Sequence, residues 1–224
     1  MDVQALGLTL RLASATTGVL FALGVPLAYW LGRSERRWKV LVEAVVALPL
    51  VLPPTVLGFY VLLAISPRSP IGRWFESLTG SRLPFTFRGL LVASVLYSLP
   101  FAVQPMAVAF GQVERRMLEA SWTLGEGRLG TFLRTVVPLA LPGIVTGAVL
   151  SFAHTLGEFG VVLMVGGNVP GETRTISISI YDHVQALDYG AAGETAAVLL
   201  AFSFLVLAVT YALQRRAWAT WPGR

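Results

Sequence analysis

The chain has 224 residues, of which 55% are hydrophobic and 13% are charged, and it contains no cysteine. Soluble globular domains carry about 25% charged residues, so this composition indicates a membrane protein. It also excludes a disordered chain, which would be poor in hydrophobic residues, and a disulfide or thiolate–metal scaffold, which needs cysteine. The net charge of +5 is compatible with a nucleic-acid binder, and the positions of the charges along the chain decide whether this class is favoured.

Five charge-poor stretches are long enough to cross a bilayer, which takes about 20 mostly apolar residues. The first is longer than the apolar part of a typical signal peptide, and no A-x-A site follows it before Arg33, which favours a membrane span over a cleaved leader. We therefore expect an all-α polytopic membrane protein in which residues 1–224 form one transmembrane domain. The predicted spans cover about 10–32, 40–66, 89–112, 138–165 and 194–214.

Basic residues are unevenly divided between the two sides of such a five-span chain. Eleven lie in the segments 33–39, 114–134 and 215–224, and six lie in the segments on the other side. By the positive-inside rule, the N-terminus is expected outside and the C-terminus in the cytoplasm. Because the charges form short clusters beside the spans and no basic stripe, a nucleic-acid binder is not favoured.

Motifs for catalysis or nucleotide binding are missing from the sequence. Lys39 is the only lysine and follows no glycine-rich loop, so the chain has no P-loop of its own. His154 and His183 are the only histidines and form no H-E-x-x-H motif. Ser151 and His154 stand three residues apart, and we interpret them as a packed polar pair on one helix face. An enzyme is therefore not expected.

The second span contains prolines at 49, 53 and 54, followed by Thr55. Each proline removes a backbone donor and frees a carbonyl in the preceding turn. If the helix enters the membrane near Val40, Pro53 lies about 20 Å deep, where protein or a water-filled cavity must satisfy the freed groups. Transporters place such broken helices beside the substrate path. A simple kink that helps packing is the alternative.

The fourth span carries one acidic residue, Glu158, between Gly157 and Gly160. A charge inside an apolar run is costly and marks a functional candidate. A regular helix from Pro138 would place Glu158 near the outer interface. Because a carboxylate repels an anion, we expect a structural or gating role, with a backbone N–H or an arginine as partner.

The loop over 113–137, between the third and fourth spans, has the most specific pattern. A short helix is predicted, with Gly125 and Gly127 ending it. One face of this helix is expected to carry Met117, Ala120, Ser121 and Leu124. The small residues in this face would let the helix seat in a partner's groove, and an amphipathic helix lying on the membrane surface is the alternative.

This loop resembles the EAA motif of ABC-importer permeases, E-A-A-x3-G-x9-I-x-L-P. Glu119, Ala120, Gly125 and Pro138 match it, while serine, threonine and valine stand at its second alanine, isoleucine and leucine. The resemblance implies that the loop forms a coupling helix that docks into a cleft of an ATPase subunit. The implied coupling residues are Glu119, Ala120, Ser121, Leu124, Gly125 and Pro138.

A narrower resemblance covers almost the whole chain. The runs over 48–55, 156–160 and 167–176 look like those of molybdate permease subunits, and sulfate and tungstate permeases share the L-G-E-F-G run. The resemblance implies a type I ABC importer permease fold, a homodimer in the cell inner membrane, two cytoplasmic ATPase subunits that hold ATP and Mg, and an extracytoplasmic oxyanion-binding protein. The chain itself is expected to bind no cofactor. Some relatives carry a C-terminal regulatory domain, and none is expected here.

The expected activity is ATP-driven import of a tetrahedral oxyanion, most plainly molybdate, by alternating access. Sulfate, thiosulfate or tungstate is an alternative cargo, and a non-transporting scaffold or a passive channel is an alternative function. The broken second span and Glu158 favour transport over a scaffold. Small polar groups and helix breaks are expected along the path or gate: Pro53, Pro54, Thr55, Ser94, Ser98, Ser151, Thr155, Gly157, Glu158 and Gly160.

Overall fold

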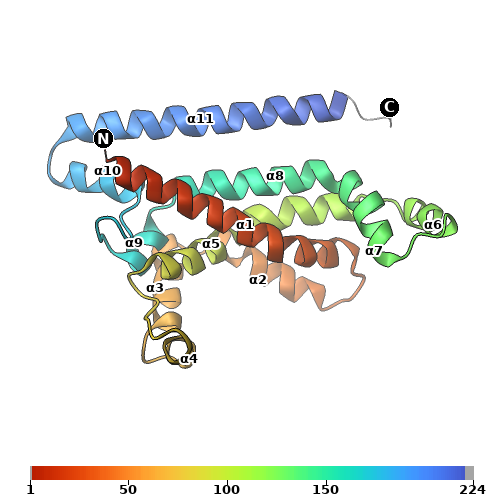
Figure 1. Cartoon of the computed structure of the whole chain (residues 1–224), viewed down its shortest axis with the longest axis horizontal. Helices are drawn as coiled ribbons and strands as arrows, with labels where there is room; N and C mark the ends of the chain where they lie inside the picture. The colour runs from red at the N-terminus through yellow and green to blue at the C-terminus, as the bar shows by residue number, and fades with distance from the viewer. Residues whose placement is uncertain (1, 220–224) are drawn as a thin grey trace.

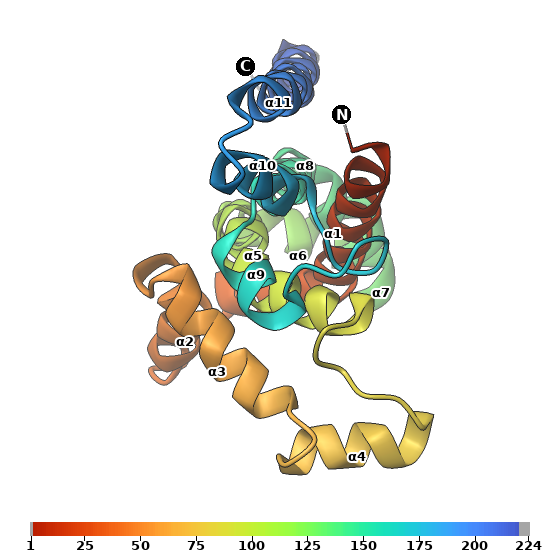
Figure 2. The ribbon, with the colours of Figure 1, turned by 90° about the vertical axis from the view of Figure 1, so that its left-hand side faces the viewer.

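The computed structural model describes residues 2–219, and every regular element in that range is a helix. Three long helices pack side by side at the centre: α1 (Val3–Arg33), α5 (Phe87–Gly111) and α8 (Val137–Leu156) (Figures 1 and 2). Their shared core is apolar and includes Leu20, Val103, Met106, Phe110 and Ile144. Because these helices are apolar on most sides, their length and composition suit a bilayer.

Polar side chains set where the central helices begin. The Ala5 N–H donates to Asp2 Oδ1 at 2.9 Å at the start of α1. The Gly89 N–H donates to Thr86 Oγ1 at 3.3 Å at the start of α5. Such caps satisfy backbone donors that have no partner inside the helix. With 25 residues, α5 is about 37 Å long and crosses the whole hydrocarbon core.

Glycines let α8 approach α5 closely. Gly143 and Gly147 stand four residues apart on α8, and both face α5. A Cβ atom on Gly147 would lie only 2.5 Å from the Ala102 carbonyl oxygen. This spacing is the small-xxx-small arrangement that brings membrane helices into backbone contact.

The second predicted span is broken. It consists of α2 (Lys39–Val51) and α3 (Pro54–Ile65), whose axes differ by 116°. The change of direction falls at Leu52–Pro53, so the simple kink considered from sequence is wrong. Figure 1 shows α3 turning away from the central bundle and leading to α4 (Pro70–Thr79), a helix that the sequence did not predict.

The fourth predicted span also differs from expectation. Its helical run begins at α7 (Arg128–Thr131), passes through a π-helical turn η1 (Phe132–Val136) and continues into α8. The segment 128–136 is therefore helix rather than loop. The run stops at Leu156, and a separate helix α9 (Gly160–Gly166) follows. Glu158 thus lies in a break, and not in a regular helix.

The remaining helices mark the two ends of the bundle. Helix α6 (Arg115–Thr123) lies at one end, while α4, α9 and α10 (Ile176–Gln185) lie at the other, with the N-terminus (Figure 1). Helix α11 (Tyr189–Ala219) runs along the bundle and contacts α8 and α10. Within residues 2–219, four helices are long and apolar enough to cross a membrane, and a fifth span results if α2 and α3 count as one.

Candidate functional site

A buried polar cluster joins α5 to α8 in the middle of the bundle. Ser98 Oγ lies 2.9 Å from His154 Nδ1 and 3.0 Å from Thr155 Oγ1. The His154 ring stacks on Phe101, with the ring centroids 4.0 Å apart, and its other neighbour is the Tyr97 ring at 4.6 Å. These contacts hold two hydroxyls and an imidazole together, and each of the three groups can donate a hydrogen bond.

Ser151 is buried near this cluster but bonds within its own helix. Its hydroxyl donates to the Ala148 carbonyl at 3.0 Å, and the Thr155 hydroxyl donates to the Ser151 carbonyl at 2.9 Å. Ser151 and His154 both lie on α8 and pack within the bundle, and His154 pairs with Ser98 on the neighbouring helix.

Glu158 lies one turn beyond this cluster, in the break between α8 and α9. The residue is only 3% exposed, and neither carboxylate oxygen has a hydrogen-bond partner among the residues that the structure describes. The Ser94 side chain of α5 lies beside it. Burying a carboxyl group without a hydrogen bond costs free energy, so its retention at this depth marks a functional position. No arginine partner of the kind expected from sequence contacts it within 2–219.

The two helix breaks pack against each other. A Cβ atom on Gly160, the first residue of α9, would lie 2.8 Å from Pro54 Cβ at the start of α3. Further along the same pair of helices, a Cβ on Gly58 would lie 2.8 Å from Met164 Cβ. The breaks are more than a hundred residues apart in sequence, yet glycines bring them into direct contact. Pro53, Thr55 and Gly157 flank these breaks and are exposed.

Helix α6 forms a second candidate site at the far end of the bundle. It ends at Thr123, and Gly125 follows with a φ of +86°, a left-handed conformation that favours glycine. Ser121 Oγ lies 3.0 Å from Thr131 Oγ1, and both residues are buried. Because this contact ties α6 to α7, Ser121 points into the protein and does not belong to the exposed face predicted for it.

Large hydrophobic residues are exposed on α6 and on the helical run after it, among charged side chains. Leu124 is 85% exposed, and Ala120 is also exposed, as is Glu119, which pairs with Arg115 at 3.1 Å. Pro138, at the start of α8, is exposed as well. We call the large exposed hydrophobic residues here the α6 surface: Met117, Trp122, Leu124, Leu129 and Leu133. An exposed apolar patch among charged residues is typical of a protein–protein contact.

The α6 surface is held firmly on the bundle. Arg33, at the end of α1, donates from Nη1 to the Val113 carbonyl at 2.6 Å, which fixes the chain just before α6. A hollow of about 400 Å³ opens between these elements. Its lining residues are Gly32, Arg33, Ser34, Glu35, Arg115 and Trp122.

Sequence reasoning found part of this site. Ser98, Thr155 and Glu158 were chosen by residue type, and they lie along the α5–α8 contact. The sequence does not predict the contacts of His154 with Ser98, Tyr97 and Phe101, since aromatic residues are ordinary in a membrane span. Within residues 2–219, no group of three His, Asp or Glu side chains is placed to hold a metal ion.

Comparisons with known proteins agree over nearly the whole chain. The family model described as the binding-protein-dependent transport system inner membrane component matches residues 24–219. A molybdenum transport system permease protein, ModB, from Azotobacter vinelandii is 54% identical over 96% of this chain and 95% of its own length. ModB from Escherichia coli K12 is 38% identical over 92% of this chain and 88% of its own length. A probable sulfate transport system permease protein, cysT, from Nephroselmis olivacea is 32% identical over 94% of this chain and 74% of its own length.

Solved structures share the fold. A bacterial ABC transporter involved in the import of the acidic polysaccharide alginate has a chain with a TM-score of 0.76 and 18% identity, over 96% of this chain and 79% of that one. The MetNI methionine ABC transporter, in an inward-facing conformation, has a chain with a TM-score of 0.73 and 16% identity, over 97% of this chain and 96% of that one. The fold is thus that of type I ABC importer permeases. Together with the full-length sequence match, it shows that this chain belongs to the family of binding-protein-dependent transport system inner membrane components.

Proposed function

We propose that this chain is the transmembrane permease subunit of an ATP-driven importer of a tetrahedral oxyanion, and that the oxyanion is molybdate. One observation carries the choice of molybdate: the chain is 54% identical, over nearly its full length, to a molybdenum transport system permease. The probable sulfate permease is only 32% identical, so sulfate is the less favoured cargo. The chain is a non-catalytic membrane component of its transporter, and ATP hydrolysis belongs to a separate subunit.

The assembly that we propose contains two copies of this chain, two cytoplasmic ATPase subunits with ATP and Mg, and an extracytoplasmic binding protein. Residues 1–224 act as one transmembrane domain, with the N-terminus outside and the C-terminus in the cytoplasm. The division of basic residues, eleven against six, supports this orientation. It places α6 in the cytoplasm, where the α6 surface would be covered by an ATPase subunit.

The chemistry of the polar cluster suits passage of a dianion. A carrier must bind its cargo weakly enough to release it, and neutral donors do this better than a buried arginine. Ser98 and Thr155 are such donors, and they lie with His154 where α5 meets α8. Glu158 would repel the anion, so its role in our proposal is in gating, through the contact between the two helix breaks.

Alternating access would use this contact. ATP binding draws the ATPase subunits together, and the α6 surface moves with them. The helical run from Arg128 to Leu156 carries this motion to the break at Glu158, where α9 packs on α3. Hydrolysis then returns the two copies to the inward-facing state.

Uptake into proteoliposomes tests the proposal. The chain is reconstituted with its ATPase partner and binding protein, and radiolabelled molybdate, tungstate and sulfate are compared at equal concentrations. We expect ATP-dependent uptake of molybdate, and none when the ATPase carries an inactive P-loop. Uptake that persists without ATP would support a passive channel. A complex that hydrolyses ATP but moves only sulfate would overturn the assignment of molybdate.

A further inference from the structure

Helix α4 lies beside the central bundle, toward the end opposite α6 (Figure 1). It is joined to α3, which ends at Ile65, and to α5, which begins at Phe87. Because α5 crosses the whole hydrocarbon core, its first residue lies at the interface between hydrocarbon and water. The residues just before Phe87 therefore lie near that interface, and the short segment 80–86 ties α4 to them.

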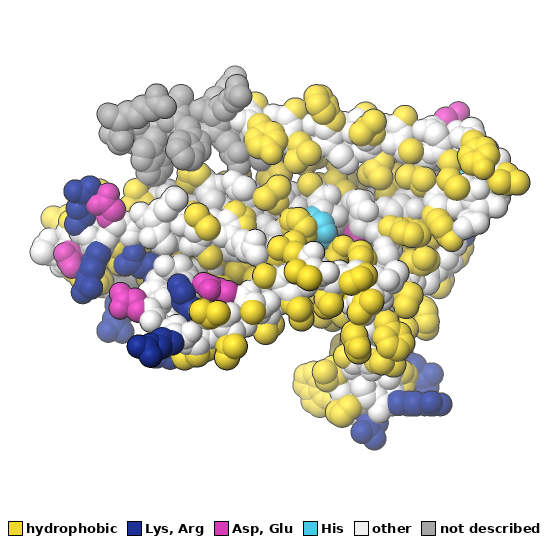
Figure 3. Space-filling view, turned by 180° about the vertical axis from the view of Figure 1, so that it is seen from behind, with side chains coloured by type: hydrophobic (Ala, Val, Ile, Leu, Met, Phe, Trp, Pro, Cys, Tyr) yellow, Lys and Arg dark blue, Asp and Glu magenta, His cyan; other side chains and the backbone are white. Residues whose placement is uncertain are grey.

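The exposed side of α4 is strongly amphipathic. Ile71, Trp74 and Leu78 are 55%, 64% and 66% exposed, and their spacing of three and four residues places them in one stripe. Arg73 and Ser77 are exposed on the polar side of the same helix. Figure 3 shows hydrophobic surface on the side of this arm that faces the α6 end, and basic side chains on its outer side. The apolar stripe is thus turned toward the level of the membrane core.

The orientation of this stripe is fixed by contacts with α3. The backbone of Gly72 packs on the Ser66 carbonyl, and the Ser69 hydroxyl accepts from the Gly72 N–H at 2.8 Å. Phe75 packs against the cluster that contains Val61 and Ile65. These contacts leave α4 little freedom to turn about its own axis.

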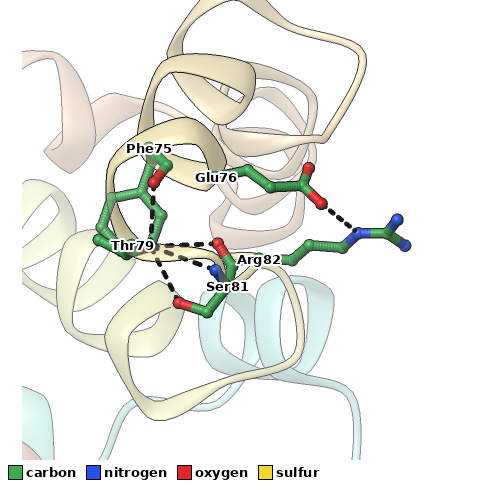
Figure 4. A network of polar contacts seen from close by, with 5 residues as sticks. All are labelled: Phe75, Glu76, Thr79, Ser81 and Arg82. Atoms are coloured by element: carbon green, nitrogen blue, oxygen red, sulfur yellow. Dashed lines mark hydrogen bonds and ion pairs between the residues drawn. The ribbon is translucent and has the colours of Figure 1, made fainter.

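Polar contacts fix the turn that follows α4 (Figure 4). The Arg82 Nε donates to Glu76 Oε1 at 3.1 Å, and the Thr79 hydroxyl donates to the Phe75 carbonyl at 2.9 Å. Thr79 Oγ1 also lies 3.0 Å from Ser81 Oγ. The apolar stripe is therefore part of a rigid arm.

Positive charge surrounds the arm. The segment 66–88 contains four arginines and a single acidic residue, Glu76, which pairs with one of them. A contact in which two copies of this segment meet at a two-fold axis would bring these arginines close together, with only the paired Glu76 to offset them. A phospholipid surface instead offers phosphates to the arginines and an acyl boundary to the apolar stripe.

We propose that α4 is an interfacial anchor that lies in the phospholipid boundary. Ile71, Trp74 and Leu78 enter the level where headgroups meet acyl chains, a position that tryptophan favours. Arg68 and Arg73 bind lipid phosphates on the aqueous side. This role does not depend on which substrate the chain carries, and it fixes the depth of the arm that begins at the break before α3.

Spin-label accessibility tests the anchor. Because the sequence has no cysteine, single cysteines at Ile71→Cys, Trp74→Cys and Leu78→Cys take a nitroxide label without background, and Ser77→Cys on the polar side is the matched control. The full-length chain is reconstituted in vesicles of phosphatidylcholine and phosphatidylglycerol. We expect nitroxide labels at the three stripe positions to collide more often with oxygen than with a water-soluble nickel complex. The label at Ser77→Cys is expected to show the reverse.

Two outcomes would overturn the anchor. Stripe labels open to the nickel complex would show that α4 stands in water. Labels shielded from both reagents would show that protein, such as a second copy, covers the stripe. A labelled variant counts as folded when its size-exclusion profile matches that of the parent chain. If one stripe variant misfolds, the other two still test the proposal.

The arginine contribution has its own readout. The double variant Arg68→Gln and Arg73→Gln, labelled at Leu78→Cys, is expected to lose at least half of the oxygen-to-nickel contrast, because the arm rises toward water. An unchanged contrast would remove the arginines from the proposal.

Discussion

Replacing Gly147 by alanine tests the close approach of α8 to α5. The new Cβ would lie 2.5 Å from the Ala102 carbonyl oxygen and 2.9 Å from Met106 Cε, whereas ordinary contact begins at 3.4 Å. The methionine end can move, but the carbonyl belongs to the α5 backbone, so α8 must shift outward by several tenths of an ångström. Overpacking of this kind costs about 1–3 kcal/mol of the free energy of unfolding.

The same substitution at Gly18 is the matched control. Gly18 lies on an exposed part of α1, and a Cβ there would meet no atom within 4 Å. Alanine in place of a helical glycine stabilises by about 0.5–1 kcal/mol, because the unfolded chain loses conformational freedom. The two substitutions are thus chemically identical and are expected to have opposite signs.

Thermal unfolding of the purified full-length chain in detergent measures both effects. For a chain of this size, 1 kcal/mol corresponds to a shift of roughly 2–4 °C in the unfolding midpoint. We expect a lower midpoint for Gly147→Ala and an unchanged or higher one for Gly18→Ala. Equal shifts in the two variants, or a higher midpoint for Gly147→Ala, would refute the backbone contact between α5 and α8.

Three further predictions concern the proposed function. Leu124→Asp changes a highly exposed position and is expected to leave the unfolding midpoint unchanged. We expect it to weaken binding of the ATPase subunit at least tenfold, measured by co-purification. Undiminished binding would exclude the α6 surface as the contact. Gly125→Val places a branched side chain at a left-handed φ, which costs about 1–2 kcal/mol, and is expected to uncouple ATP hydrolysis from uptake; normal coupled uptake would contradict this. Ser98→Ala removes two hydrogen bonds, each worth about 0.6 kcal/mol in a membrane helix pair, and is expected to lower the unfolding midpoint by roughly 2–5 °C and to slow uptake about tenfold. Wild-type uptake rates would remove the cluster from the path.

Spans are predictable from sequence because hydrocarbon tolerates few charges. The stretches without Asp, Glu, Lys or Arg therefore indicate the long helices, and Pro53 and Pro54 indicate where the second one breaks. The angle of that break is set by how α3 packs on α9 through Gly58 and Gly160, a contact between distant segments that no local pattern contains. Helix α4 was missed because ten residues of mixed polarity do not register in a search for spans.

The candidate site was predictable in its residue types and less so in its pairings. Ser98 and Thr155 stand out as polar residues in apolar helices, but their contact depends on how α5 and α8 are rotated against each other. Ser121 was expected on an outer face, and its contact with Thr131 turns it inward. The break after Leu156 was visible only as two glycines around a glutamate, which fit a close helix approach equally well.

The π-helical turn accommodates one extra residue within the helical run from Arg128 to Leu156. Residues Arg128–Leu156 form 29 residues of nearly continuous helix, about 43 Å long, with the α6 surface at one end and Glu158 just past the other. A π turn is one residue wider than an α turn, and each helical residue turns the chain by about 100°. Deleting one residue within Phe132–Val136 would therefore convert the π turn into an α turn and keep the rotational register of the two ends, whereas deleting one residue from the regular part of α8 would rotate one end relative to the other by more than a quarter turn.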